Sequence, residues 1–260
     1  MMLSLTQGSL GVASGTLVGF SLGLVGGGGS ILAVPLLIYL VGVSDPHMAI
    51  GTSAIAVAAN AAANLVNHAR AGNVKWRCAA VFAVAGIAGA FLGSTLGKLM
   101  DGEKLLALFT VIMMVVGALM LKRRSGGGEA SVRLDKENLP KLLISGLATG
   151  ALSGFFGIGG GFLIVPALIF ATGMPILYAV GSSLVAVTAF GLTTAANYAL
   201  SGFVDWSLAG LFILGGIIGG LIGTRSANSL ADRKGALNTV FAALIFAVAI
   251  YMLVRSLGAM

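Results

Sequence analysis

GLVGGGGSILAVPLL, residues 23–37, and GFFGIGGGFLIVPAL, residues 154–168, are the two stretches that decide the fold of this chain. They belong to a longer match in which residues 14–38 align with residues 145–169 at 12 identical positions of 25. A glycine run and a following proline recur at the same places in both copies. Self-similarity of this kind indicates duplication of one structural unit.

A second pair of matching segments follows each copy in step. Residues 49–76 align with residues 179–206 at 11 identical positions of 28, and both segments end on a tryptophan. The chain is therefore predicted to contain a first repeat, residues 1–121, and a second repeat, residues 142–260. Residues 122–141 are the only long polar stretch and form the predicted linker between the repeats.

The composition indicates a helical membrane protein. Of the 260 residues, 58% are hydrophobic and 9% are charged, whereas soluble domains carry about 25% charged residues. No Lys, Arg, Asp or Glu occurs in residues 1–44 or 142–204. Because one crossing needs only about 20 apolar residues, the predicted fold class is an all-α polytopic membrane protein.

Each repeat is predicted to begin with a helix pair that is broken by glycine. Residues 8–43 would form a helix about 54 Å long, but the hydrocarbon core of a bilayer is about 30 Å thick. Glycine suits a tight reversal at the break because it adopts positive φ. The pair is either a re-entrant hairpin or two short crossings, and the sequence leaves both open. Three transmembrane helices follow in each repeat, at residues 46–69, 78–97 and 105–121, and at residues 176–200, 207–224 and 236–254.

The two repeats are predicted to have inverted topology. Either form of the broken pair returns the chain to its starting side, so the three further spans give each repeat an odd number of crossings. With inverted repeats, 12 of the 15 Lys and Arg residues fall on one side, as the positive-inside rule requires. Parallel repeats give at best a split of 10 to 5. Linker 122–141 is then cytoplasmic.

The glycine breaks are the predicted substrate site. Non-helical backbone at membrane depth must be satisfied by protein or water, so the breaks should line a cavity. A helix that restarts after a break, at Ser30 in the first repeat, directs free N–H groups and its positive dipole end into that cavity, which favours an anion. We expect the two breaks to face each other. The break residues are Gly26, Gly27, Gly28, Gly29 and Ser30 in the first repeat and Gly157, Gly159, Gly160 and Gly161 in the second.

Close helix packing is the alternative role for these glycines. We favour packing for the Gly-xxx-Gly patterns within residues 14–19 and 145–150, and the substrate site for the central runs. Paired hydroxyls then begin the next helix of each repeat, in Gly51, Thr52 and Ser53 and in Gly181, Ser182 and Ser183. They can donate to substrate oxygens, or equally well to neighbouring helices. Asn60 is a weaker candidate, because Phe190 occupies its position in the second repeat.

Five further residues are candidates for gating or coupling. Asn67 and Asn197 are predicted near helix ends on opposite faces of the membrane, where capping is the more common role. His68 corresponds to Tyr198 and is expected at the membrane interface, where it can titrate near neutral pH. Asp45 is the sole acid before the first basic loop and is a candidate for proton coupling.

Other function classes lack their motifs. The basic residues are scattered at the ends of apolar segments and form no nucleic-acid-binding face. Two histidines and the single Cys78 predict no metal site, and no phosphate-binding loop or other cofactor motif is present. An intramembrane enzyme or assembly factor that uses Ser14, Ser145 or His68 is an alternative, although no oriented nucleophile and base are predicted.

The doubled glycine element, followed in each repeat by a GTS or GSS helix start, resembles the TauE/SafE family of sulfite and organosulfonate exporters. The resemblance covers residues 8–254. It implies transport of sulfur oxyanions such as sulfite or sulfoacetate across the bacterial inner membrane, with the proton gradient as an implied driving force. It also implies that the breaks and the helix starts at Gly51 and Gly181 form the site.

These observations predict a secondary transporter that exports a small sulfur oxyanion by alternating access. Backbone N–H groups and hydroxyls hold the anion, and the lipid bilayer is the predicted surrounding. A passive anion channel is the alternative within membrane transport. The sequence determines neither the exact substrate, nor the direction and coupling ion, nor the oligomeric state.

Overall fold

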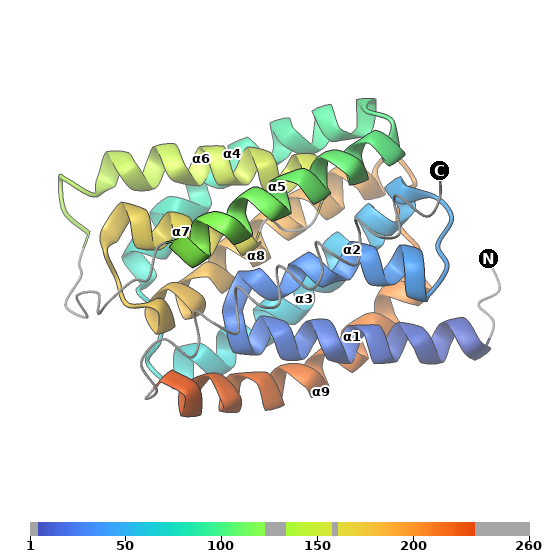
Figure 1. The fold of residues 1–260 in the computed structure, drawn as a ribbon, viewed down its shortest axis with the longest axis horizontal. Helices are drawn as coiled ribbons and strands as arrows, with labels where there is room; N and C mark the ends of the chain where they lie inside the picture. The colour runs from blue at the N-terminus through green and yellow to red at the C-terminus, as the bar shows by residue number, and fades with distance from the viewer. Residues whose placement is uncertain (1–4, 123–133, 158–160, 232–260) are drawn as a thin grey trace.

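The computed structural model describes residues 5–122, 134–157 and 161–231, and this part of the chain is helical throughout (Figure 1). The first repeat contains α1 (Leu5–Val25), the 3₁₀ helix η1 (Gly26–Leu32), α2 (Ala33–Pro35), the π-helix η2 (Leu36–Leu40), α3 (Pro46–Arg70), α4 (Trp76–Leu99) and α5 (Gly102–Lys122). The second contains α6 (Leu139–Phe156), α7 (Gly161–Thr172), α8 (Ile176–Ala199) and α9 (Trp206–Ala231).

The helices fall where the sequence predicts membrane spans. Within the described residues, six stretches are long and apolar enough to cross a bilayer: Leu5–Leu40, Pro46–Arg70, Trp76–Leu99, Leu139–Phe156, Ile176–Ala199 and Trp206–Ala227. The all-α polytopic fold class is confirmed. Two parts of the prediction, the last span at 236–254 and most of the linker, lie outside the described residues. Helix α5 reaches Lys122 and α6 begins at Leu139, so both ends of the predicted linker are helical.

Residues 5–40 do not form one straight rod, as the length argument predicts. Gly26 has φ +64°, a conformation that other residues rarely adopt, and the chain turns back there. Gly29 consequently packs against the backbone of Ser21 and Leu22 in α1, which a continuous helix would place well out of reach. Figure 1 shows η1 and η2 returning along α1.

The second repeat breaks at the equivalent glycine. Gly157 ends α6 with φ +65°, and α7 follows from Gly161. The 12 residues of α7 rise only about 18 Å, against about 30 Å for the hydrocarbon core. Helix α7 is thus too short for a full crossing, which favours the re-entrant hairpin in this repeat.

Helix α1 packs along α9, and α6 packs along α4. The first helix of each repeat thus contacts the second of the three transmembrane helices predicted for the other repeat. Glycines make the contact: Gly15 and Gly19 lie against the backbone of Phe212 and Gly216, and Gly146 and Gly150 lie against the backbone of Phe82 and Gly86. A Cβ at any of these positions would meet a main-chain carbonyl oxygen. The packing role that we favoured for residues 14–19 and 145–150 is confirmed.

The equivalent helices α3 and α8 cross in the middle of the bundle and run antiparallel. Gly51 near the start of α3 lies against Tyr198 near the end of α8, and Gly191 lies against Ala58. Figure 1 likewise shows α1 and α6 running in opposite directions. This arrangement is the one that inverted repeats require, whereas the orientation in a membrane remains a prediction.

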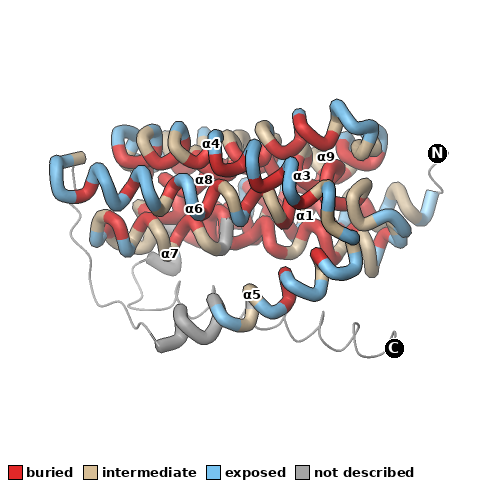
Figure 2. Tube along the Cα trace, turned by 90° about the horizontal axis from the view of Figure 1, so that it is seen from above, coloured by how far each residue is buried: buried red, intermediate tan, exposed pale blue. Residues whose placement is uncertain are grey.

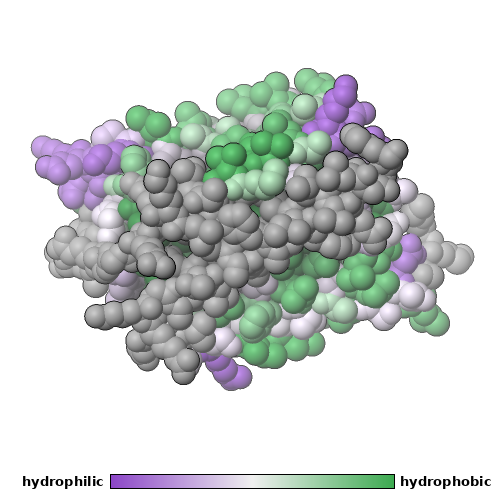
Figure 3. Space-filling model, viewed as in Figure 1, coloured by the Kyte–Doolittle hydropathy of each residue, from purple (hydrophilic) through white to green (hydrophobic). Residues whose placement is uncertain are grey.

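The outer surface is apolar along the helices. Large hydrophobic side chains are exposed on most of them, including Phe91, Leu92 and Leu96 on α4, Ile144 on α6, and Leu214 and Ile218 on α9. Figure 3 shows this hydrophobic flank, with hydrophilic side chains nearer the ends of the long axis. The buried residues lie on the inward faces of the packed helices, and α5 stands at the margin (Figure 2). A bilayer would cover this surface without leaving backbone polar groups exposed to lipid.

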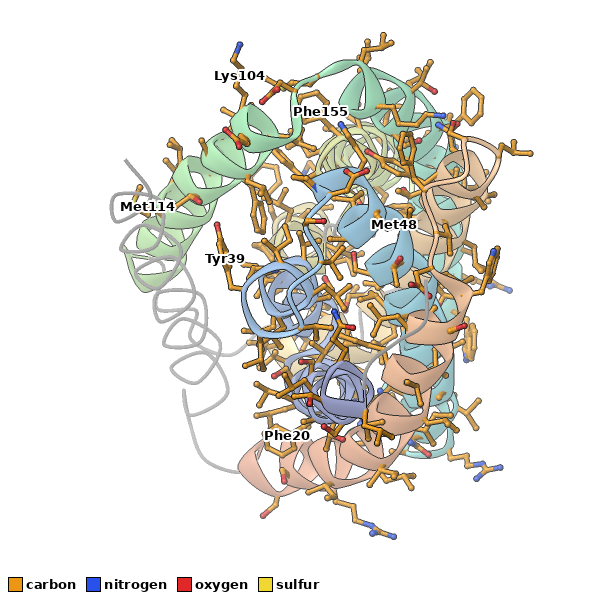
Figure 4. The ribbon with its side chains drawn as sticks, turned by 90° about the vertical axis from the view of Figure 1, so that its right-hand side faces the viewer. Phe20, Tyr39, Met48, Lys104, Met114 and Phe155 are labelled. Atoms are coloured by element: carbon orange, nitrogen blue, oxygen red, sulfur yellow. The ribbon has the colours of Figure 1, made fainter. Side chains whose placement is uncertain are left out.

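The view in Figure 4 separates the two cross-repeat helix pairs. Phe20 lies with α1 and α9 toward one side, Phe155 lies toward the other side near α6, and Met48 of α3 lies between them. Helix α3 therefore occupies the centre of the described bundle, where 13 of its 25 residues are buried.

Candidate functional site

The first glycine break is buried and packs on the second repeat. Gly26 to Ser30 are all buried, and the space where Gly26 lacks a side chain is bounded by Ser183 Oγ and the Val180 carbonyl oxygen, each 2.6 Å from an added Cβ. The helix does not restart at Ser30 as predicted. Helix η1 begins at once with Gly26, because the left-handed glycine reverses the chain within one residue, and Ser30 Oγ donates to the Gly27 carbonyl oxygen at 2.8 Å.

The break leaves one backbone donor and one backbone acceptor to be satisfied from elsewhere. In an uninterrupted α-helix, the Gly27 N–H would donate to the Gly23 carbonyl oxygen. Here the Gly27 N–H donates to Ser183 Oγ at 3.0 Å, and the Gly23 carbonyl oxygen lies 2.9 Å from His68 Nε2. Ser183 of α8 and His68 of α3 thus replace the missing helical hydrogen bond and stabilise the reversal of the chain.

His68 lies in the last turn of α3, so its expected position at the membrane interface stays a prediction. Its side chain is fully buried, with Nε2 on the Gly23 carbonyl and Nδ1 3.5 Å from Asn73 Nδ2. The carbonyl groups at the end of α1 have no helical partner, and the imidazole N–H fills that need. Periodicity places His68 near a helix end, but it does not show which helix terminus lies opposite.

The second break has the same packing with α3 in place of α8. A side chain at Gly157 would overlap Ile50, which corresponds to Val180 at an offset of 130 residues. Ser53 Oγ donates to the Ile50 carbonyl at 2.9 Å, and Ser183 Oγ donates to the Val180 carbonyl at 2.7 Å. Gly159 and Gly160 lie outside the described residues, and Gly161 begins α7.

The two glycines that reverse the chain lie apart. Gly26 packs on the first turns of α8 and Gly157 packs on the first turns of α3, and these turns lie at opposite ends of the bundle because α3 and α8 are antiparallel. Segment η1, which contains the first break, contacts α7, which begins at Gly161 of the second break. Because Gly159 and Gly160 lie outside the described residues, the expectation that the two breaks face each other stays a prediction. The predicted site residues therefore form two groups. Gly26–Ser30 lie by Gly181–Ser183, and Gly157 lies by Gly51–Ser53.

The first hydroxyl of each pair, in Thr52 and in Ser182, binds the backbone of a loop of the other repeat. Thr52 Oγ1 accepts from the Asp205 N–H at 2.9 Å, and Ser182 Oγ accepts from the Lys75 N–H at 2.9 Å. A Cβ at Gly51 or Gly181 would overlap the backbone of these same loops. For these four residues the contacts favour the packing interpretation, while Ser183 alone among the six touches the backbone of a described break.

Ser182→Ala tests this division of roles. The variant removes the acceptor of the Lys75 N–H, and we expect a loss of about 1 kcal/mol in the free energy of unfolding, with the KM for the transported anion unchanged. Thermal unfolding in detergent and flux in proteoliposomes measure the two quantities. A raised KM at unchanged stability would return Ser182 to the substrate site.

The side-chain amide of Asn197 is hydrogen-bonded at both its oxygen and its nitrogen, in a polar network between α4 and α8. Its Oδ1 accepts from Lys98 Nζ at 2.8 Å, and its Nδ2 donates to Ser94 Oγ at 2.7 Å. Lys98 Nζ also donates to Ser201 Oγ at 2.8 Å. These bonds join the two helices at the end opposite His68, so a gating role for Asn197 requires them to break.

The remaining gating candidates, Asn67, Asp45 and Tyr198, make fewer hydrogen bonds to other helices than Asn197 does. Asn67 is only partly buried. The Asp45 carboxylate accepts from the His47 N–H at 2.8 Å and caps α3, so this contact is structural and gives no support to proton coupling. Tyr198 is fully buried, and its hydroxyl has no hydrogen-bond partner among the described residues.

Comparison with known proteins places the chain in a family. The family model for sulfite exporter TauE/SafE matches residues 11–252. The chain belongs to this family. A probable membrane transporter protein of Xylella fastidiosa (strain 9a5c) is 56% identical over 246 residues, which cover 94% of each chain. The probable membrane transporter protein YdhB of Bacillus subtilis (strain 168) is 26% identical over 215 residues, 82% of this chain and 87% of the relative. No solved structure matches significantly.

One polar residue of this TauE/SafE family member is buried without partners in the described part of the chain, and the sequence ranks it low as a site candidate. Asn60 is fully buried near the middle of α3, and neither Nδ2 nor Oδ1 has a hydrogen-bond partner among the described residues. We ranked it low because its counterpart Phe190 is apolar. A polar side chain in the middle of a predicted span was itself the signal, since such residues are costly in membranes and mark pathways.

Proposed function

We propose that this chain is a secondary carrier that exports a small sulfur-containing oxyanion, such as sulfite or sulfoacetate, across the bacterial inner membrane by alternating access. Its family and its relatives make it a multi-pass membrane protein of a transporter family. The family description names sulfite exporters, which supports the substrate class. The broken helices support a carrier, because secondary transporters bind substrates at such breaks.

The contact between η1 and Ser183 carries the proposal. The Gly27 N–H is paired with a hydroxyl of the other repeat, not with its own helix. A movement of α8 away from η1 frees this N–H to donate to an oxyanion. The Ser183 hydroxyl, which donates to the Val180 carbonyl of its own helix at 2.7 Å, can join it by turning from that carbonyl to the anion.

No Lys or Arg lies within residues 5–69 or 142–224. Lys75 is the basic residue beside this contact: its N–H donates to Ser182, and its ammonium lies 4.5 Å from the centre of the Tyr178 ring. The anion would then be held mainly by the Gly27 N–H and the Ser183 hydroxyl, a moderate attraction that lets a carrier release its ligand.

The enzyme alternative gains no support from the contacts of its candidate residues. Ser14 Oγ has no partner among the described residues, Ser145 Oγ donates to carbonyl oxygens of its own helix, and His68 is held by Gly23 and Asn73. None of these contacts joins a hydroxyl to an imidazole, as an activated nucleophile requires.

Flux of labelled sulfite, sulfoacetate, sulfate and chloride in proteoliposomes, with and without an imposed pH gradient, tests the proposal. We expect saturable flux of a sulfur-containing oxyanion that rises with the gradient. Currents carried equally by all four anions, independent of the gradient, would favour the channel. Absence of flux for both sulfite and sulfoacetate would contradict the proposed substrate class.

A further inference from the structure

The amide of Asn60 is an unexplained polar group in the centre of the bundle. Asn60 is fully buried, and its amide nitrogen and oxygen both lack hydrogen-bond partners in the part of the chain that the structure describes. An amide can donate two hydrogen bonds and accept two. Leaving all of them unmade in a buried site is costly, so an occupant or a function is required to explain it.

The amide faces a seam between three helices. Nδ2 lies directly against Gly216 of α9, and Gly216 lies against Gly19 of α1. One turn further along α3, Asn64 Oδ1 accepts from Thr224 of α9 at 3.1 Å. Because glycine lines the facing helices at the level of Asn60, the amide is the main polar side chain there.

The equivalent seam of the second repeat shows that this position does not need a polar group. Phe190 replaces Asn60 there, packs against Gly86 of α4 and stacks on Phe82 at a ring distance of 6.1 Å. The same helical framework therefore accepts a large apolar side chain at this position. The asparagine in the first repeat costs stability that the fold could avoid, which points to a functional role.

The helices that form the seam carry no acidic side chain that would repel an anion. Helices α1, α3 and α9 carry no Asp or Glu along their described lengths. The ionisable side chains on them are basic: His47, His68 and Arg70 on α3 and Arg225 on α9. An oxyanion that enters the seam meets an amide donor and no carboxylate.

We propose that Asn60 binds the transported oxyanion near the middle of the membrane, with its Nδ2–H groups donating to an anion oxygen in the seam between α1, α3 and α9. This site rests on the proposed function and adds a second binding position to it, because Asn60 lies at the level of Gly19, about 10 Å along α1 from the break at Gly26. The second repeat has no equivalent site, because Phe190 occupies the position that corresponds to Asn60. The first repeat then contributes a side-chain amide to anion binding that the second repeat lacks.

Asn60→Phe tests the proposal with a side chain that the fold already accepts at the equivalent position. We expect sulfite flux to fall by about tenfold to a hundredfold, the effect of one lost hydrogen bond to a charged ligand. We also expect the detergent Tm to rise, because an unpaired buried amide is removed. Thr194→Val is the matched control. It removes a buried hydroxyl of α8 that also lacks a partner among the described residues, and it should keep wild-type flux.

Stability and flux together separate the outcomes. A folded Asn60→Phe variant with wild-type sulfite flux overturns this inference, and so does a lowered Tm with flux lost only in proportion to the folded fraction, which assigns Asn60 to structure. A wild-type chain that moves neither sulfite nor sulfoacetate contradicts the proposed function instead. In that case a sulfite-dependent rise in Tm that Asn60→Phe abolishes still supports the binding residue, and its absence overturns it.

Discussion

Ser183→Ala combined with His68→Leu should nearly abolish sulfite transport. The two substitutions remove the acceptor of the Gly27 N–H and the donor to the Gly23 carbonyl, which leaves two buried backbone groups unpaired at about 1–3 kcal/mol each. Segment η1 should move away from α8, because the two unpaired backbone groups can then bind water. We expect each single variant to lose about tenfold in flux and the double variant about a hundredfold or more.

Conservative variants separate positioning from general stability. His68→Gln keeps an N–H donor that can reach the Gly23 carbonyl, and Ser183→Thr keeps the hydroxyl, so both should regain most of the flux. The neighbouring Ser182→Ala serves as a control of similar size. If His68→Gln is as inactive as His68→Leu while Ser183→Thr is active, the imidazole has a role other than holding the break.

Gly19→Leu and Gly150→Leu should prevent folding. A Cβ at Gly19 would overlap the Gly216 carbonyl, and a Cβ at Gly150 would overlap the Gly86 carbonyl. The neighbours are backbone and cannot rotate away, so α1 must separate from α9, or α6 from α4. Overpacking of a core typically costs about 1–3 kcal/mol, and the loss of a whole helix interface costs more. The yield of monodisperse protein in detergent should collapse.

Gly210→Leu is the matched control for this prediction. Gly210 lies on α9, and nothing is within 4 Å of an added Cβ there. The variant should purify in wild-type amounts, since leucine also favours helix over glycine by about 1 kcal/mol. Normal yields of Gly19→Leu would show that α1 and α9 do not pack as closely as described.

The fold was predictable where it depends on chain length and on glycine. The 36 apolar residues 8–43 cannot be one straight span, and the reversals fall at Gly26 and Gly157, the two equivalent glycines with φ near +65°. The placement of Gly26 and Gly157 at opposite ends of the bundle was not predictable. It follows from the antiparallel crossing of α3 and α8, which is a tertiary contact that periodicity does not encode.

The candidate site was predicted in its residue types but not in its partners. Ser182 and Ser183 are adjacent, so their side chains point about 100° apart on the helix, and one meets a loop while the other meets the break. The sequence cannot make that distinction without the neighbouring helices. The burial of the Asn60 amide without hydrogen-bond partners among the described residues could not be predicted either, because Asn60 breaks the symmetry of the two repeats and its second-repeat counterpart Phe190 is apolar.

Exchange of labelled sulfite across proteoliposomes tests the central claim most directly, with wild type compared with Gly28→Leu in the buried first break. We predict that unlabelled sulfite on the opposite side accelerates wild-type exchange, as in a carrier whose loaded form reorients faster than its empty form, and that Gly28→Leu, folded in detergent, shows no exchange. Exchange in wild type that ignores sulfite on the opposite side, or wild-type exchange in Gly28→Leu, would contradict a carrier that binds its anion at the glycine break.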